Sequence, residues 1–243
     1  MPSVVMRHSA DEGMPADEPK KRLIEAGLEL FGKFSFDGAS TRMLVDRAQV
    51  NLASIKYYFG SKEGLYLAVA GHIAEEIGAL LQPRLAKVKK ALKKKELSGQ
   101  QSFRLLCELM EFLVTHFLGR PRTAKWLNII VREQLCPTDA FGILFEGFMR
   151  PLEESLFGLA THIMGSGRDD QEVKLRVFAI MGQIQIFNIS PSAIKRTLEW
   201  EDFGPENLDA IRRVIVDNLK RIFSVSSDCS DGSPVMRVPP EKR

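Results

Sequence analysis

The sequence has few of the features that mark secreted, membrane-spanning or metal-binding proteins. Its three cysteines, Cys107, Cys136 and Cys229, are odd in number and show no CxxC spacing. This argues against a disulfide framework or a zinc knuckle and favours a reducing compartment. The N-terminus lacks the apolar core of a signal peptide, and no segment reaches the roughly 18 uninterrupted apolar residues of a membrane span. We therefore expect a cytoplasmic protein with no membrane partner.

Motifs of catalysis and nucleotide binding are also absent, since the chain carries no GxGxxG, P-loop, HExxH or internal repeat. His72 with Glu75 and Glu76 has a metal-compatible spacing, but no further ligands lie nearby in the sequence. We expect no metal ion, no cofactor and no enzymatic activity. The net charge of +3 on 243 residues permits an anionic partner without requiring one.

Apolar residues recur at helical spacing along most of the chain, and no segment shows sustained period-two alternation, so the sequence predicts an all-α fold. The first helix begins near Pro19 and ends near Phe34, and Ser40 or Thr41 caps the second. The third ends at Phe59, before a left-handed Gly60, and the fourth stops before Pro83. Longer helices are predicted at about 101–119, 122–135, 138–164, 171–188 and 205–223. The polar segments 1–18 and 224–243 read as disordered.

The third predicted helix has an outer side that suits a DNA major groove. Leu52, Ile55 and Phe59 form one side, while Ala53, Ser54 and Tyr57 lie opposite. Small and hydrogen-bonding residues let a helix backbone approach base edges and phosphates. The segment from Pro19 to Tyr66 holds eight Lys and Arg against five acidic residues. The alternative is a short amphipathic helix whose tyrosines only pack on a neighbour.

The stretch "RLIEAGLELFGKFSFDGASTRMLVDRAQVNLASIKYYFGSKEGL" resembles the DNA-binding domain of the TetR family of bacterial transcriptional regulators. "VREQLCPTDAFGILFEGFMRPLEESL" resembles the ligand-binding domain of that family's CecR subgroup. The resemblance implies a helix-turn-helix domain at 19–66 and a helical effector-binding and dimerisation domain at 67–223. It also implies a homodimer that binds a palindromic operator and is released from it by a small-molecule effector.

The resemblance assigns roles in DNA binding to individual residues. Thr41 would cap its helix against a phosphate, although a plain N-cap is an equal alternative. The groove-facing residues would be Asn51, Ala53, Ser54 and Lys56, and the backbone would be gripped by Tyr57, Tyr58 and Lys62. Lys56 stands where a tyrosine is common in the family, which implies a distinct operator preference. For Lys62 the alternative is a solvated lysine.

Two helices in the C-terminal half have the patterns of a four-helix dimer interface. In the segment 171–188, one apolar side repeats with four-three spacing, and Leu175, Phe178, Gly182 and Ile186 form a second. The residues predicted for the interface are Val173, Val177, Ile180, Ile184 and Phe187 with Leu208, Ile211, Ile215, Leu219 and Ile222. The alternative is that both helices belong to one monomeric core.

The effector site is predicted from polar residues within apolar stripes. Glu133 projects between Trp126, Ile129 and Ile130, so it is either a buried paired charge or a pocket group. The candidate pocket residues are Phe112, His116, Trp126, Glu133, Phe145, Phe148 and Gln183, each of which could instead be ordinary core. The sequence thus predicts a ligand-responsive repressor. The competing classes are a helical small-molecule enzyme and a protein-interaction module without specific DNA binding.

Overall fold

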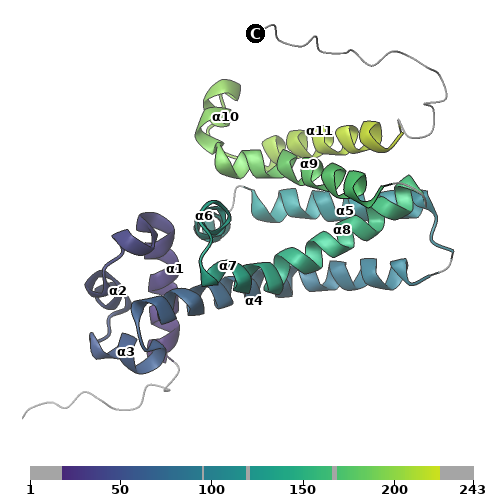
Figure 1. The fold of residues 1–243 in the computed structure, drawn as a ribbon. Coiled ribbons are helices and arrows are strands. Elements are labelled where there is room, and N and C mark those ends of the chain that lie inside the picture. Colours follow the sequence, from purple (N-terminus) through teal and green to yellow (C-terminus); the bar gives the residue numbers. More distant parts are fainter. Residues whose placement is uncertain (1–17, 95, 119–120, 166–168, 225–243) are drawn as a thin grey trace, which may run out of the picture. The chain divides into compact units, whose positions relative to one another are not determined.

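The computed structural model describes residues 18–94, 96–118, 121–165 and 169–224. In these ranges the secondary structure is helical, which confirms the predicted all-α class (Figure 1). The predicted disordered segments 1–18 and 224–243 lie, apart from Glu18 and Ser224, outside the described residues. The helices are α1 Glu18–Gly38, α2 Thr41–Ala48, α3 Ala53–Phe59, α4 Lys62–Leu92, α5 Gly99–Phe117, α6 Pro121–Leu135, α7 Asp139–Leu144, α8 Arg150–Met164, α9 Asp170–Ile189, α10 Pro191–Leu198 and α11 Pro205–Ser224, with a π-helical segment Phe145–Met149 between α7 and α8.

The chain forms two compact units. The first contains the described residues up to Pro83 and those within Arg120–Leu152, and the second contains those within Arg84–Gly119 and from Glu153 onward. Helix α4 runs through the boundary, because it continues past Pro83 to Leu92. The expected stop before Pro83 is therefore wrong. A proline removes one hydrogen bond from a helix interior, but it can be retained where the rest of the helix is supported by packing.

In the first unit, α1, α2 and α3 form a three-helix group that we call the head. Its core is apolar, with Leu23, Phe31, Leu44 and Ile55 buried. Helix α1 packs against α2 and also against α6, which is far away in the sequence. The head therefore shares its longest helix with the part of the unit formed by α6 and α7.

Helix boundaries in the first unit follow local capping chemistry. Ser40 Oγ accepts a hydrogen bond from Met43 N at 3.2 Å and caps α2, so Ser40 rather than Thr41 is the cap. Gly60 ends α3 with a φ of 76°, which confirms the predicted positive φ, although its ψ of −41° lies outside the left-handed helical region. Ser61 Oγ then accepts from Gly64 N at 3.1 Å at the start of α4.

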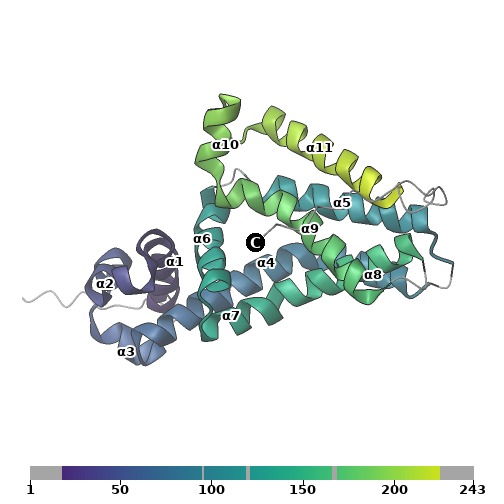
Figure 2. The ribbon, with the colours of Figure 1, turned by 45° about the horizontal axis from the view of Figure 1, so that its top comes forward.

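The second unit contains α5, α9, α10, α11 and most of α8. Helix α11 lies along α5 in both views (Figures 1 and 2). Arg176 of α9 donates to the Ile222 carbonyl of α11 at 3.2 Å, and Asn218 of α11 donates to Gln183 of α9 at 3.0 Å. Helix α10 was not predicted, although Pro191 at its first turn is a common start signal.

Within the described residues, α4 is long and apolar enough by composition to cross a membrane, and α9 with α10 would pass the same test only if the two helices, bent by 82°, were counted as one span. The apolar residues of α4 are instead used in packing, since Leu65, Val69, Ile73, Ile77 and Leu81 are all fully buried within the structure. Such a helix is what the core of a helical domain requires.

Candidate nucleic-acid interface and adjoining pocket

The outer side of α3 is open to solvent. Ala53, Lys56 and Tyr57 are exposed, with Tyr57 at 81%, while Ile55 is buried in the head. The rings of Tyr57 and Tyr58 meet edge to face with centroids 4.8 Å apart. This arrangement leaves a lysine and a phenol hydroxyl available to a ligand on that side. Leu52, expected on the buried side, is 61% exposed, because it precedes the first turn of the helix.

Two of the predicted groove contacts already interact with one another. Asn51 Oδ1 accepts hydrogen bonds from both the backbone N and the Oγ of Ser54, each at 3.0 Å. Asn51 therefore caps α3, and Ser54 is half-buried beside it. Thr41 is exposed in the first turn of α2. These three residues remain candidates for DNA contact, but the structure gives Asn51 and Ser54 a local role as well.

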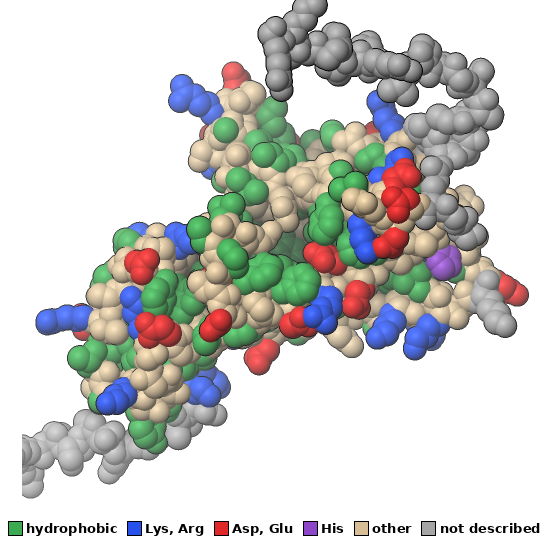
Figure 3. Space-filling model, viewed as in Figure 1, with side chains coloured by type: hydrophobic (Ala, Val, Ile, Leu, Met, Phe, Trp, Pro, Cys, Tyr) green, Lys and Arg blue, Asp and Glu red, His purple; other side chains and the backbone are tan. Residues whose placement is uncertain are grey.

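Lys62 lies at the start of α4 with its Nζ 4.3 Å from the centre of the Phe36 ring. A cation over a ring face is held by the ring quadrupole. Lys62 is therefore positioned by Phe36 and is not a freely solvated lysine. Figure 3 shows basic and acidic side chains interspersed over the head in this view. The DNA-binding side is therefore argued from α3 and its neighbours and not from the charges seen on this face.

Gly64 fixes the tight connection between α3 and α4. A Cβ at this position would lie 1.9 Å from the backbone oxygen of Phe59, a distance that no side chain can tolerate. Gly64, the second glycine of the sequence "YYFGSKEGL", is thus required because two backbone segments approach each other closely here. It holds the N-terminus of α4, with Lys62, beside the end of α3.

Helix α1 breaks at Ser35, where φ is 67° and ψ is 176°. A helix end leaves carbonyl groups without partners inside the helix. Here side chains of α6 supply donors. Arg132 Nη1 donates to the Phe31 oxygen at 2.5 Å, and Asn128 Nδ2 donates to the Gly32 oxygen at 3.2 Å. The end of the longest head helix is therefore capped by α6.

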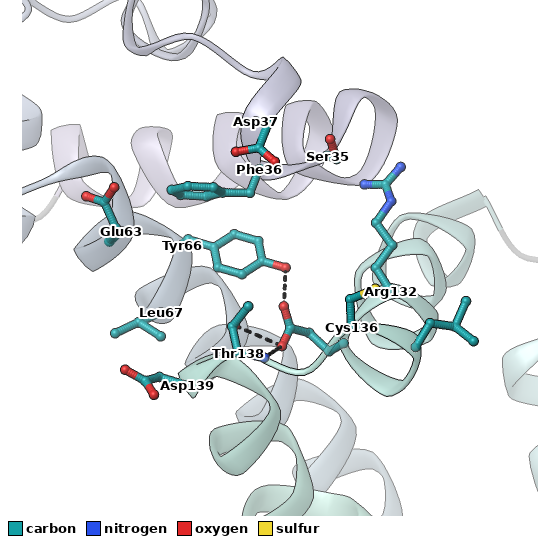
Figure 4. A pocket seen from close by; sticks show the side chains of 12 residues that line it. Ser35, Phe36, Asp37, Glu63, Tyr66, Leu67, Arg132, Cys136, Thr138 and Asp139 are labelled. Atoms are coloured by element: carbon teal, nitrogen blue, oxygen red, sulfur yellow. Dashed lines mark hydrogen bonds between the residues drawn. The ribbon is translucent and has the colours of Figure 1, made fainter.

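Glu133 is the centre of a buried hydrogen-bond network and is only 2% exposed. Tyr66 Oη of α4 donates to its Oε1 at 2.7 Å, and the backbone N and Oγ1 of Thr138 donate to its Oε2 at 2.9 Å each. In Figure 4 these hydrogen bonds are the dashed lines that start at Tyr66 and Thr138, and Arg132 is directed toward α1. Burial, and secondly the Glu133 carboxylate, raise the pKa of Tyr66. Glu133 thus joins α4, α6 and the start of α7 through neutral donors rather than a paired charge.

A pocket of about 450 Å³ borders this network within the first unit (Figure 4). Its walls come from the broken end of α1, the start of α4, the end of α6 and the start of α7. The lining residues are Ser35, Phe36, Asp37, Glu63, Tyr66, Leu67, Arg132, Glu133, Leu135, Cys136, Thr138 and Asp139. Of the seven predicted effector-site residues, Glu133 is the one that lines it.

Comparison with known proteins decides the family. Residues 23–69 match the family described as bacterial regulatory proteins, tetR family, and residues 101–224 match the C-terminal domain of the HTH-type transcriptional dual regulator CecR. The chain is 30% identical over 207 residues to CecR of Shigella flexneri, covering 85% of this chain and 92% of that protein. This chain belongs to the TetR family. It is therefore a DNA-binding transcriptional regulator with a CecR-type C-terminal domain, and its family is not one of enzymes.

Another relative and two solved structures are also similar to this TetR-family regulator. The transcriptional repressor NicS of Pseudomonas putida is 26% identical over 132 residues, covering 53% of this chain and 54% of that protein. Two crystal structures share the fold at a TM-score of 0.53. One is a TetR-family regulator from Mesorhizobium loti, at 12% identity and covering 86% of this chain and 98% of that chain. The other is a TetR-like regulator from a Rhodococcus species, at 18% identity and covering 87% and 99%.

The predicted dimer residues of this TetR-family regulator require a correction. Seven of the ten are buried within the single chain: Val173, Val177, Ile180, Ile184, Ile211, Ile215 and Leu219. A side chain covered by its own chain offers no area to a partner. Phe187, Leu208 and Ile222 are half-buried. The exposed apolar residues of α9 are on its second side, with Leu175 at 61%, Phe178 at 52% and Ile186 at 47%.

The predicted effector residues are divided between the two units. Trp126, Phe145 and Phe148 belong with Glu133 to the first, whereas Phe112, His116 and Gln183 belong to the second. In the second unit, Arg84 stacks on the Phe112 ring and Gln183 accepts from Asn218. A single effector pocket formed by all seven remains a prediction.

Proposed function

We propose that this regulator is a repressor that binds a palindromic operator as a homodimer and releases it when a small-molecule effector binds. The observation that carries the proposal is the open outer side of α3, with Lys56 and Tyr57 exposed beside Lys62. A helix of this kind, preceded by α2 and a tight turn, suits insertion into a major groove. We favour repression over activation because the similar protein NicS is a repressor, although the similar protein CecR is a dual regulator. The site of action would be the bacterial cytoplasm.

The roles proposed for the α3 residues follow from their positions. Lys56 is exposed on the helix and has a long side chain that can reach the edge of a guanine. Tyr57 and Lys62 lie toward the end of α3 and the start of α4, where hydroxyl and ammonium groups can bind phosphates. Phosphate contacts act on all sequences alike, so their loss weakens binding uniformly.

A homodimer is supported by the exposed apolar stripe of α9. Leu175, Phe178, Gly182, Ile186 and Ile189 are three or four residues apart and so share one side of the helix. A Cβ on Gly182 would meet nothing within 4 Å, so a partner helix has room to approach there. An exposed apolar stripe of this length is unusual for a monomer. We propose that a second copy covers it.

The operator is tested by selection from random duplex DNA at low salt with the full chain. We expect an enriched palindrome whose half-sites lie about one helical turn apart. The affinity should fall steeply as salt rises, since bound phosphates release counterions. Lys56→Ala should change the preferred bases, and Tyr57→Ala should weaken all sequences similarly. If no palindrome is enriched, the repressor proposal is wrong.

The dimer is tested by sedimentation velocity on Leu175→Glu and Ile186→Glu. Both should shift the chain toward monomer and weaken operator binding, because each places a charge in the stripe. Leu135→Glu is the matched control, since Leu135 is 76% exposed but lies on α6 in the first unit. A stripe variant that remains as dimeric as this control would show that α9 is not the interface.

A further inference from the structure

The pocket beside the head has a strongly acidic lining. Four carboxylates, Asp37, Glu63, Glu133 and Asp139, and one guanidinium, Arg132, give it a formal charge of −3. The guanidinium is used elsewhere, since its two terminal nitrogens donate to the carbonyls of Phe31 and Gly32. Glu133 is 98% buried and receives its hydrogen bonds from a phenol, a hydroxyl and a backbone amide. The buried charge is thus solvated but not neutralised by these contacts.

The pocket also has an aromatic and aliphatic wall. The rings of Phe36 and Tyr66 meet at 64° with centroids 5.3 Å apart, and Leu67 and Leu135 extend the apolar surface. The Lys62 ammonium lies 4.3 Å from the centre of the Phe36 ring, which shows that an aromatic ring at this pocket attracts a cation, although the face used by Lys62 is already occupied. Apolar walls with a few charged groups are typical of small-molecule sites, and a volume of about 450 Å³ lies within their usual range.

We propose that this pocket binds an organic cation, such as a protonated amine attached to a fused aromatic ring. The carboxylates favour the charge, and the rings of Phe36 and Tyr66 favour both the charge and an apolar body. An anion of the same shape would meet the acidic lining and be rejected. Binding of this kind needs neither DNA nor a dimer.

The proposed ligand would lie where it can influence the head. The pocket wall includes Ser35, at the break of α1, and Arg132, which caps that helix end. Phe36 contacts the ligand on one side and Lys62, a proposed phosphate contact, on another. The use of this site to regulate operator binding rests on the proposed function, whereas the binding itself does not.

Isothermal titration calorimetry with the full chain tests the charge preference. Three probes share one ring system: naphthylmethylamine, naphthylmethanol and naphthylacetate, which are cationic, neutral and anionic at neutral pH. The amine should bind about tenfold more tightly than the alcohol, and the acetate more weakly than both. Equal binding of amine and alcohol would overturn the proposal. Since no DNA is present, a failed operator selection would leave this result intact.

The position of the ligand is tested by alkylation of the cysteines, followed by mass spectrometry. Cys136 is exposed at the pocket, while Cys107 is a half-buried thiol of α5 in the second unit. Saturating naphthylmethylamine should slow the reaction of Cys136 with N-ethylmaleimide and leave Cys107 unchanged. Unchanged reactivity at Cys136 would place the amine elsewhere and contradict the proposal.

Variants that remove single carboxylates give a second test of whether the amine lies in this pocket. Glu63→Gln and Asp139→Asn remove exposed carboxylates, so folding should be preserved. Each should weaken the amine about fivefold, as expected for one charge at about 4 Å in water. Asp46→Asn is the matched control, because Asp46 is an exposed carboxylate of α2 that does not line the pocket. If both pocket variants bind the amine as well as this control, the carboxylates do not recognise it and the proposal is wrong.

Discussion

The buried carboxylate of Glu133 allows a quantitative test of how the first unit is held together. Tyr66→Phe removes the hydroxyl that donates to Oε1 at 2.7 Å and changes little else. Hydrogen bonds to charged groups contribute about 1.5–3 kcal/mol, and the acceptor left behind is buried. We therefore expect Tyr66→Phe to lower the free energy of unfolding by about 2 kcal/mol. Tyr57→Phe is the control, since Tyr57 is 81% exposed and its hydroxyl should contribute less than about 0.5 kcal/mol.

Glu133→Gln tests the same bond from the other side. The amide oxygen can still accept from Thr138, but the amide nitrogen then faces Tyr66 and reverses or breaks that hydrogen bond. We expect a loss of about 1–2 kcal/mol. In the double variant with Tyr66→Phe, the combined loss should be smaller than the sum of the two by about 1 kcal/mol, because the two changes remove one shared interaction.

Urea unfolding in a Trp200→Phe background isolates this measurement. Trp126 then remains as the fluorescent reporter, and it lies on α6, the helix that carries Glu133. A chain with two compact units need not unfold in one step, so a reporter in the first unit is required. If Tyr66→Phe unfolds within about 0.5 kcal/mol of its parent, or if the two changes add, the network does not stabilise the unit as argued.

Three further predictions concern the head. Gly64→Ala should lower the free energy of unfolding by about 3 kcal/mol and abolish DNA binding, since its Cβ would overlap the Phe59 backbone oxygen. If unfolding followed by circular dichroism shows a variant as stable as its parent, this prediction is wrong. Gln49→Gly should stabilise the head by about 0.5–1 kcal/mol, because Gln49 caps α2 with a φ of 55°; an unchanged urea midpoint would contradict it. The hydrogen bond from Arg47 lowers the pKa of Glu29, so Arg47→Ala should destabilise the head at neutral pH by up to about 1 kcal/mol. That difference should fade as the pH drops below the ordinary Glu29 pKa of 4.5 and through the lowered value, and a difference that persists in acid would exclude this ion pair as its cause.

The sequence predicted those parts of the fold that depend on local chemistry. The end of α3 at Phe59 and the positive φ of Gly60 each follow from one or two residues, and each is confirmed. The break of α1 at Ser35 also agrees with the predicted end near Phe34. The continuation of α4 past Pro83 could not be predicted locally, because the residues beyond the proline are supported by distant segments: Val88 is buried, and Leu92 packs beside Gly158 of α8.

The features of the candidate sites that the sequence did not predict depend mostly on contacts between residues far apart in the sequence. Periodicity identified two apolar sides of α9, but it cannot say which one the chain's own core covers, and the covered side was assigned to the dimer. Glu133 was predicted to be either a buried paired charge or a pocket group. It is buried and lines a pocket, but its hydrogen-bond donors are neutral, and its role in binding an effector stays a prediction. Its partner Tyr66 lies 67 positions away, and no local pattern connects them. Asn51 was assigned to DNA contact, although its spacing to Ser54 also fits a helix cap.

The capping of α1 by α6 makes the head dependent on residues far beyond its own sequence. A fragment ending at the predicted domain boundary, residue 66, would lose Arg132 and Asn128, the donors to the Phe31 and Gly32 carbonyls. It would also expose the Tyr66 ring, which packs edge to face on Phe31 at 5.0 Å. The loss of these hydrogen bonds would destabilise α1, against which both α2 and α3 pack. Any displacement of α6, including one caused by a ligand beside Arg132, must therefore change the stability of the helices that present α3 to DNA.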